Sequence, residues 1–253
     1  MHRDSTGRLL RQYLQQLLLT IRLAVPAVAG ADGEALHRLR TALRQLRCLL
    51  RMLPPQSATT LLAPLQAGLG EFTRRSNPWR DREVRLQLLQ AMAAQADTQA
   101  FARWRRREAG QIARGRGLLS QQGAELELLL QAAWQYCLPL LAGDSKRLHK
   151  ALRHELRRSR RRYRRQRAVL RQQPQDATQA HRTRLLAKRL RYQVEVCAGV
   201  VGKRWRQRAA RARLWQQRLG DSRDHMLLLQ SLQRDQVPLP AVLRRQLGLV
   251  RSP

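Results

Sequence analysis

One cationic pattern occurs twice in this sequence, about 144 residues apart. In each copy a histidine is followed by arginine or lysine three, seven and ten residues later: His37, Arg40, Arg44 and Arg47, then His181, Arg184, Lys188 and Arg191. Guanidinium and ammonium groups form charge-assisted hydrogen bonds to phosphate oxygens, and an imidazole N–H can donate to the same oxygens. A repeat of such groups in register indicates a polyanionic partner rather than a reaction.

The sequence lacks the residue combinations on which phosphate-transferring enzymes depend. Phosphoryl transfer uses carboxylates that hold Mg²⁺, whereas the acidic residues here are few and scattered. No paired carboxylates and no nucleophile beside a base are found, and the arginines that flank His37 and His181 would repel a metal ion. We therefore expect a protein that is not an enzyme and that has no cofactor and no metal site.

Apolar residues beside each pattern predict the helices that position it. In the first copy leucines recur at alternating spacings of three and four residues from Leu36 to Leu53, which is typical of a core-facing stripe. Each cation follows a leucine by one position, so the cationic stripe, which continues to Arg51, is rotated by about 100° around the helix. One stripe should anchor the helix while the other faces a groove or pore. The second copy has a similar apolar seam: Thr183, Ala187, Leu190, Val194 and Cys197.

A third basic segment precedes the second copy and holds eight arginines within the eleven residues from Arg157 to Arg167. Charges this dense can mark a solvated helix face or a disordered arm. Leucines at helical spacing argue against disorder, and crowded like charges would weaken a helix that has no ligand. We expect a helix over 145–171 with one ligand-facing side: His149, Arg153, Arg157, Arg160 and Arg164.

The charge balance of the whole chain supports an anionic partner. Its 253 residues include 50 lysines and arginines against 17 aspartates and glutamates, a formal net charge of +33. Such an excess destabilises a compact chain by self-repulsion unless an anion is bound. Nearly all the cations are arginines, whose planar guanidinium suits phosphate. The base composition of the genome can also raise the arginine content. Charge alone does not separate polyphosphate from nucleic acid.

Composition predicts an all-helical chain, because β-branched and aromatic residues are scarce and Pro- or Gly-containing breaks separate long Leu-, Ala-, Gln- and Arg-rich segments. No apolar run is long enough to span a membrane and no signal peptide is visible, so we expect a cytoplasmic protein without membrane insertion. The three cysteines lack CxxC spacing and are expected to be reduced core thiols. The expected helices are 8–25, 33–53, 57–75, 79–95, 98–118, 121–142, 145–171, 176–198, 203–219, 221–234 and 239–248.

A second repeat, Arg80-Asp81 and Arg223-Asp224, lies 143 residues apart, each copy just ahead of a leucine-rich helix. Internal duplication in an all-helical chain favours two four-helix-type bundles related by a pseudo-two-fold axis. We expect a single domain of two similar halves and a connecting helical segment: 1–253 as a whole, 1–118 and 143–253 as the halves, and 119–142 between them.

Three segments resemble the CHAD (conserved histidine α-helical domain) family: HRLRTALRQLRCLL at 37–50, HRTRLLAKRLRYQVEV at 181–196 and LGDSRDHMLLLQSL at 219–232. The second is the most specific, because its histidine and arginine precede Lys-Arg-Leu-Arg-Tyr and a glutamate. The resemblance covers most of the chain and implies two four-helix bundles about a pseudo-two-fold axis, with a basic central cavity or pore. We expect a stand-alone member without the CYTH (triphosphate tunnel) domain that precedes many others.

The same resemblance implies binding of inorganic polyphosphate and association with polyphosphate granules. Because the first helix, 8–25, is much less basic than 146–171, we expect the second half to bind more strongly. By position, the histidines of the family fall on His37 and His181, and its basic motif residues fall on Arg40, Arg44, Arg47, Arg184, Lys188, Arg189 and Arg191.

We therefore expect a non-catalytic polyphosphate-binding protein, and a nucleic-acid-binding basic helical protein is the alternative. Base stacking needs exposed aromatic side chains among the cations, and only Tyr163 and Tyr192 fall in the basic motifs. The sequence leaves the oligomeric state open.

Overall fold

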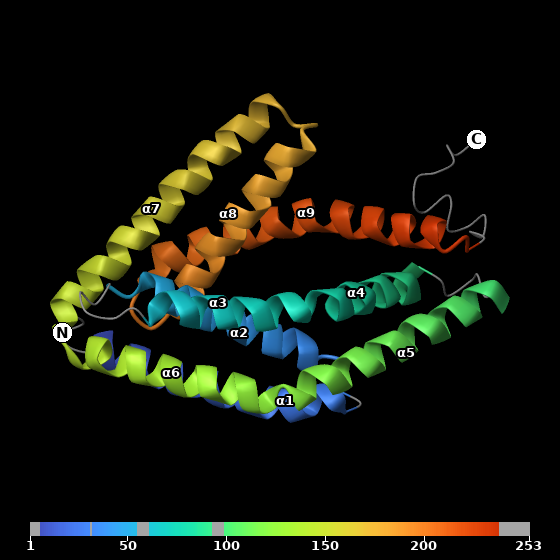
Figure 1. Cartoon of the computed structure of the whole chain (residues 1–253). Helices are drawn as coiled ribbons and strands as arrows, with labels where there is room; N and C mark the ends of the chain where they lie inside the picture. The colour runs from blue at the N-terminus through green and yellow to red at the C-terminus, as the bar shows by residue number, and fades with distance from the viewer. Residues whose placement is uncertain (1–5, 31, 55–60, 93–98, 238–253) are drawn as a thin grey trace.

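A computed structural model describes residues 6–30, 32–54, 61–92 and 99–237, and these form nine helices and no strand (Figure 1). The expected all-helical class is confirmed. The expected helix at 239–248 and the side chains of Arg223 and Asp224 lie outside the described residues. The helices are α1 (Thr6–Ala29), α2 (Ala35–Met52), α3 (Leu62–Arg75), α4 (Asn77–Met92), α5 (Gln99–Gln121), α6 (Gly123–Ala142), α7 (Ser145–Gln172), α8 (Ala177–Val196) and α9 (Lys203–Arg234).

The predicted apolar stripes form the core of the protein. Every leucine of the first stripe, from Leu36 to Leu53, is buried, and so is every residue of the second seam, from Thr183 to Cys197. The helix α2 packs against α1 and α3, and α6 packs against the same two, so these four helices form a closed ring of contacts (Figure 1). Three helices of the first half, α1 to α3, thus form a four-helix bundle with α6, which lies in the predicted connecting segment 119–142.

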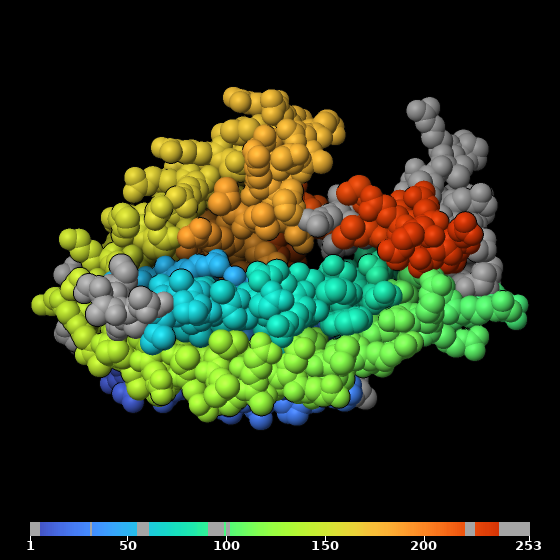
Figure 2. Space-filling model, in the orientation of Figure 1, coloured from blue at the N-terminus to red at the C-terminus, as the bar shows by residue number. Residues whose placement is uncertain are grey.

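The second half begins with two neighbouring helices, α7 and α8, and the end of α7 and the start of α8 project from the rest of the molecule (Figures 1 and 2). An aspartate caps each of them: its carboxylate accepts hydrogen bonds from two backbone N–H groups, at 2.8 and 3.3 Å for Asp144 and at 2.7 and 3.0 Å for Asp176. Such a cap contributes about 1 kcal/mol to helix stability. The helix α8 also packs against α9 and against α2. Each helix that carries a histidine pattern therefore packs on the helix before it, while the pseudo-two-fold relation of the halves stays a prediction.

One expected helix break is wrong. The sequence predicts separate helices at 203–219 and 221–234, whereas α9 runs unbroken through Gly220. An interior glycine costs roughly 0.5–1 kcal/mol relative to alanine, and packing here outweighs that cost. Gly220 is buried against α8, where a Cβ would lie 3.4 Å from the Arg184 Nε. The stretch that the predicted repeat aligns with α9 forms two helices, α3 and α4, which only Ser76 separates.

The three cysteines are free thiols, and burial raises the pKa of each to about 12. Cys137 and Cys197 are fully buried, so the expected core position is confirmed for them, while Cys48 is half-buried. None of the described helices combines the length and the apolar character needed to cross a membrane.

The contact between α4 and α5 generates a test of the packing. A Cβ on Gly115 of α5 would overlap the Trp79 indole of α4, so we expect Gly115→Ala to lower the free energy of unfolding by about 1–3 kcal/mol. Two residues later, Gly117 has nothing within 4 Å of its Cβ position. Gly117→Ala should therefore stabilise the protein by about 0.5–1 kcal/mol through helix propensity. Urea denaturation of both variants measures the difference, and shifts in the same direction would contradict this packing.

Candidate polyanion-binding cleft

The two cationic patterns lie on helices that pack against each other, α2 and α8. Between these helices is a cleft of about 360 Å³, which we call the α2–α8 cleft. Five cations line it: Arg44, Arg47 and Arg51 from α2, and Lys188 and Arg189 from α8. The rest of its wall consists of Cys48, Leu185, Tyr192 and Gln193. Predicted ligand-binding residues from both copies thus share one cleft, while the basic central cavity or pore stays a prediction.

Lys188 is the cation of the cleft that its surroundings affect most. Its burial, together with the positive charges of Arg44, Arg184, Arg40 and Arg191, lowers the pKa of its ammonium from 10.5 to about 7. An anion in the cleft would oppose this shift, because a nearby negative charge favours the protonated amine. The proton on Lys188 and an anion in the cleft therefore stabilise each other.

Four cations of the cleft have no carboxylate partner in the part of the chain that the structure describes. Among the described residues, no ion pair is formed by Arg44, Arg47, Arg51 or Lys188. The fifth cation, Arg189, donates to a glutamate of α7 at 2.8 Å. The positive charge of the cleft is therefore largely unneutralised by the protein.

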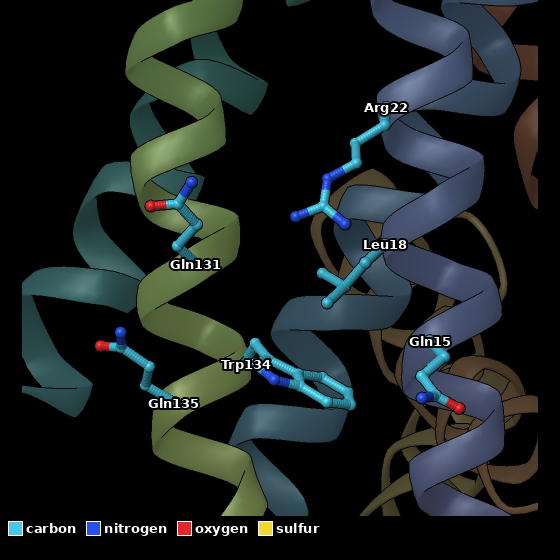
Figure 3. A pocket seen from close by; sticks show the side chains of 6 residues that line it. All are labelled: Gln15, Leu18, Arg22, Gln131, Trp134 and Gln135. Carbon is cyan, nitrogen blue, oxygen red and sulfur yellow. The ribbon is translucent and has the colours of Figure 1, made fainter.

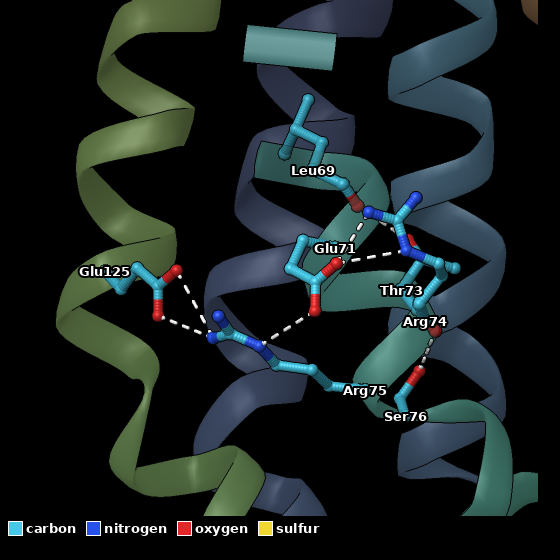
Figure 4. A network of polar contacts seen from close by, with 7 residues as sticks. All are labelled: Leu69, Glu71, Thr73, Arg74, Arg75, Ser76 and Glu125. Atoms are coloured by element: carbon cyan, nitrogen blue, oxygen red, sulfur yellow. Dashed lines mark hydrogen bonds and ion pairs between the residues drawn. The ribbon is translucent and has the colours of Figure 1, made fainter. Parts of the chain in front are cut away.

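Arginines on the outer face of α3 are paired, in contrast. The Glu71 carboxylate accepts hydrogen bonds from Arg74 at 2.6 Å and from Arg75 at 3.3 Å, and Arg75 also donates to Glu125 of α6 at 3.0 Å (Figure 4). Exposed pairs of this kind contribute only about 0–1 kcal/mol to stability. Their main consequence is to neutralise positive charge on this face.

The cationic stripes also hold buried donors that lack partners. The guanidinium Nε atoms of Arg40, Arg47 and Arg184 are buried without a hydrogen-bond acceptor among the described residues. An unpaired buried donor costs roughly 1–3 kcal/mol. The fold therefore keeps these arginines in place at a cost in its own stability.

Arg40 has a structural role that sequence reasoning did not assign to it. Its side chain is buried, and its guanidinium donates to the Thr73 carbonyl at 3.1 Å, to the Asn77 Oδ1 at 2.8 Å and to the Ser76 hydroxyl. Burial and the charge of Arg44 lower the pKa of Arg40 to about 10. The contacts of Arg40 fasten α2 to the junction of α3 and α4, and its contact with a ligand stays a prediction.

The two histidines are not among the residues that line the α2–α8 cleft. His37 lies at the surface of α2, and the burial of part of its ring together with the charge of Arg80 from α4 lowers its pKa. His181 and Arg184 line a separate hollow of about 690 Å³ between the start of α8 and the middle of α9. The remaining lining of that hollow is mostly apolar, with Leu219 and Met226 from α9.

The predicted ligand-binding residues of α7 are not among those that line the α2–α8 cleft. The His149 Nδ1 lies 3.4 Å from the Thr6 hydroxyl of α1. Partial burial and the charge of Arg208 from α9 lower the pKa of Arg160. These residues stay predicted contacts on a different surface, together with three exposed arginines of the same face: Arg153, Arg157 and Arg164.

Glu155 is the residue of α7 that reaches the cleft wall, and sequence reasoning missed it. Its carboxylate accepts hydrogen bonds from Arg189 at 2.8 Å and from Gln193 at 3.3 Å. Glu155 is the one acidic residue between Asp144 and Asp176, and this isolation within a strongly basic segment was a signal that could have found it.

A hollow of similar size between α1 and α6 lacks free charge. It measures about 380 Å³ and is lined by three glutamines with Leu18, Trp134 and Arg22 (Figure 3). The Arg22 guanidinium donates to both carboxylate oxygens of Glu127, at 2.9 and 2.7 Å. The α2–α8 cleft is therefore the better anion site. In the part of the chain that the structure describes, no three His, Cys, Asp or Glu side chains are grouped to hold a metal ion.

Fold and site together define an all-helical protein with a cationic cleft between two similar helices. The chain belongs to the CHAD domain family, whose model matches residues 10–233. Its structure is similar to the crystal structure of the CHAD domain from the plant Ricinus communis, with a TM-score of 0.70 and 23% identity over 98% of this chain and 93% of that one. No curated protein matches the chain in sequence. The family predicted from the motifs is thereby confirmed.

The different environments of Arg40 and Arg44 predict different effects on stability. Arg40→Gln removes the hydrogen bonds to Thr73, Ser76 and Asn77, so we expect it to lower the free energy of unfolding by about 1–3 kcal/mol. Arg44→Gln removes a charge that repels Lys188 and should leave the stability unchanged or raise it. Urea denaturation at low salt compares the two variants, and a greater loss for Arg44→Gln would refute these assignments.

The lowered pKa of Lys188 predicts a pH-dependent stability. Between pH 7 and 10.5 the unfolded chain retains a proton on this amine that the folded protein releases, so its contribution to stability rises with pH. At pH 7 we expect Lys188→Met to be more stable than the unmodified protein by at least about 1.4 kcal/mol, the equivalent of one pKa unit. This gain should shrink as the pH rises toward 10. Chemical denaturation at several pH values measures the difference, and a pH-independent gain would count against the lowered pKa.

Proposed function

We propose that this protein binds inorganic polyphosphate in the α2–α8 cleft without turning it over. The observation that carries the proposal is the meeting of both cationic stripes in one cleft, where Arg44, Arg47, Arg51 and Lys188 form no ion pair with any described carboxylate. Polyphosphate binding reported for the CHAD family supports the same ligand. Such a protein would collect at polyphosphate granules in the cytoplasm.

Binding is multivalent in this proposal. A polyphosphate chain repeats its anionic group, so one ligand contacts several guanidinium groups at once. An arginine guanidinium can bind two phosphate oxygens at once, and the release of counterions from the polyphosphate drives association. Lys188 takes up a proton as the anion arrives, because the negative charge opposes the effect of the surrounding arginines. Affinity should therefore fall as salt rises and as pH increases above 7.

The carboxylates near the cleft support a non-catalytic role. Glu155 is held by Arg189 and Gln193, while Glu195 accepts a hydrogen bond from Gln45 at 3.3 Å and pairs with Arg191 at 3.6 Å. Phosphoryl transfer depends on carboxylates that are available to Mg²⁺. Both glutamates instead orient cations and amides of α2 and α8.

The wall of the cleft favours a phosphate chain over nucleic acid. Recognition of single strands relies on bases stacked upon exposed aromatic faces. Tyr192, the aromatic residue that lines the cleft, is buried, and the Arg191 guanidinium lies 4.5 Å from its ring centre. The cleft supplies charge without a stacking surface.

A charge-matched pair of double variants tests the site. Arg44→Gln/Lys188→Gln removes two cations from the cleft, and Arg103→Gln/Arg114→Gln removes two exposed cations from α5. Calorimetry with polyphosphate of defined length should give a loss of affinity of about tenfold or more for the cleft variant, since charged hydrogen bonds are lost. The α5 variant, which changes only the overall charge, should lose less than about threefold. Equal losses would reject the cleft as the site.

Three further experiments separate the alternatives. Arg153→Gln/Arg157→Gln tests the α7 face, where a loss as large as that of the cleft variant would move the site to α7. Competition by DNA at matched phosphate concentration tests ligand class: efficient displacement of polyphosphate would favour a nucleic-acid partner. Phosphate release in Mg²⁺ or Mn²⁺ should stay at background.

A further inference from the structure

The amine of Lys188 is available for covalent chemistry as well as for binding. The cleft that it lines is rich in groups that hold phosphate, and the amine stands among them. Resting on the anion-binding function proposed above, we propose that Lys188 is a site of acylation by acyl phosphates, which the arginines of the cleft recruit through their phosphate group.

An anion bound by the arginines of the cleft would lie beside this amine. Arg44, Arg47 and Arg51 of α2 line the cleft together with Lys188. On α8 itself, Arg184 lies four residues before Lys188 and Arg191 three residues after it, so both are neighbours on the helix surface. A phosphate group held by the arginines of α2 therefore brings an attached acyl carbon close to the lysine.

The other charged groups around the cleft do not restore the proton to Lys188. From α2, Arg40 adds a further positive charge that lowers its pKa. From α7, Glu155 is bound by Arg189, and Glu195 of α8 is bound by Gln45 and Arg191. The carboxylates near the cleft are thus engaged with other partners.

An amine is a nucleophile only when it has lost its proton. Burial and the four arginines lower the pKa of Lys188 to about 7, so a large share of this amine is unprotonated at neutral pH. A lysine in water, with a pKa near 10.4, is almost wholly protonated there. The chain contains only three other lysines, and all are exposed: Lys146, Lys150 and Lys203.

The reaction needs no further reagent. The Lys188 Nζ attacks the acyl carbon and forms an amide C–N bond, while the bond from that carbon to the phosphate oxygen breaks. The phosphate leaves with the electron pair of the broken bond and takes up the proton that the amine loses. Arginines that bind the phosphate oxygens stabilise the charge that develops on this leaving group.

Acylation would weaken polyphosphate binding by the same cleft. A neutral amide replaces the amine, so Lys188 can no longer gain the proton that a bound anion favours. The added acyl group also occupies part of a cleft of about 360 Å³. Polyphosphate and acyl phosphates therefore compete for the arginines. The amide that an acyl phosphate forms on Lys188 remains after the phosphate has left, so the loss of polyphosphate affinity persists.

Acetyl phosphate provides the test. The full chain is incubated with it near neutral pH, and peptide mass spectrometry follows acetylation at the four lysines. We expect Lys188 to react at least about tenfold faster than Lys146. The larger unprotonated fraction of Lys188 outweighs the lower intrinsic nucleophilicity that accompanies a lower pKa. Added polyphosphate should protect Lys188 alone, and Arg44→Gln should slow its reaction.

Acetic anhydride, which carries no phosphate, is the matched reagent. The preference for Lys188 should be smaller with the anhydride, and an equal preference would overturn recruitment through the phosphate. Reaction of Lys188 no faster than the exposed lysines with either reagent would overturn the whole proposal. Calorimetry on the same preparation keeps the two ideas separate: selective acetylation without polyphosphate binding would refute the proposed function and leave the acylation site standing.

Discussion

The packing of α2 against α8 is the constraint on which the cleft depends. Buried leucines such as Leu43 and Leu190 hold these helices in the core, and each contributes roughly 1.5–3 kcal/mol. Each cationic stripe lies only about 100° around the helix from its apolar seam, so burial of both seams leaves the stripes at the edge of the helix contact. Two like charges 4 Å apart repel by roughly 1 kcal/mol in water and 4 kcal/mol near a protein surface. The summed burial of leucines exceeds such terms, and the fold tolerates the crowded cations.

The few carboxylates of the chain determine where this crowding persists. Glu71, Glu125 and Glu127 neutralise arginines on outer faces, whereas Arg44 and Lys188 receive no such partner among the described residues. Burial and the neighbouring arginines lower the pKa of Lys188, and no described carboxylate opposes their effect. In the proposed complex a phosphate chain would supply the missing negative charge. The electrostatics of the fold are thereby connected to the proposed ligand and to the proposed reactivity of the amine.

Periodicity was sufficient to predict the helical class and the buried seams, because burial of an apolar stripe depends mainly on local spacing. The meeting of Arg44 with Lys188 follows from a tertiary contact between α2 and α8 that spacing alone does not specify. The same limit explains the other differences. Arg40 has the spacing of a ligand-facing residue but turns into the junction of α3 and α4, and Gly220 has the composition of a break but packs against Arg184. On α7, the charges indicated a basic helix without showing that Glu155, rather than the arginine face, would reach the cleft.

The protonation of Lys188 tests most directly the central claim that an anion completes a cationic cleft. With only four lysines in the chain, isotope labelling of lysine gives four side-chain signals that NMR can follow through a pH titration. We predict that one lysine titrates near pH 7 in the free protein and that its pKa rises toward that of an ordinary lysine when polyphosphate is added. Four lysines that titrate together near pH 10.5, with none responding to polyphosphate, would contradict the claim.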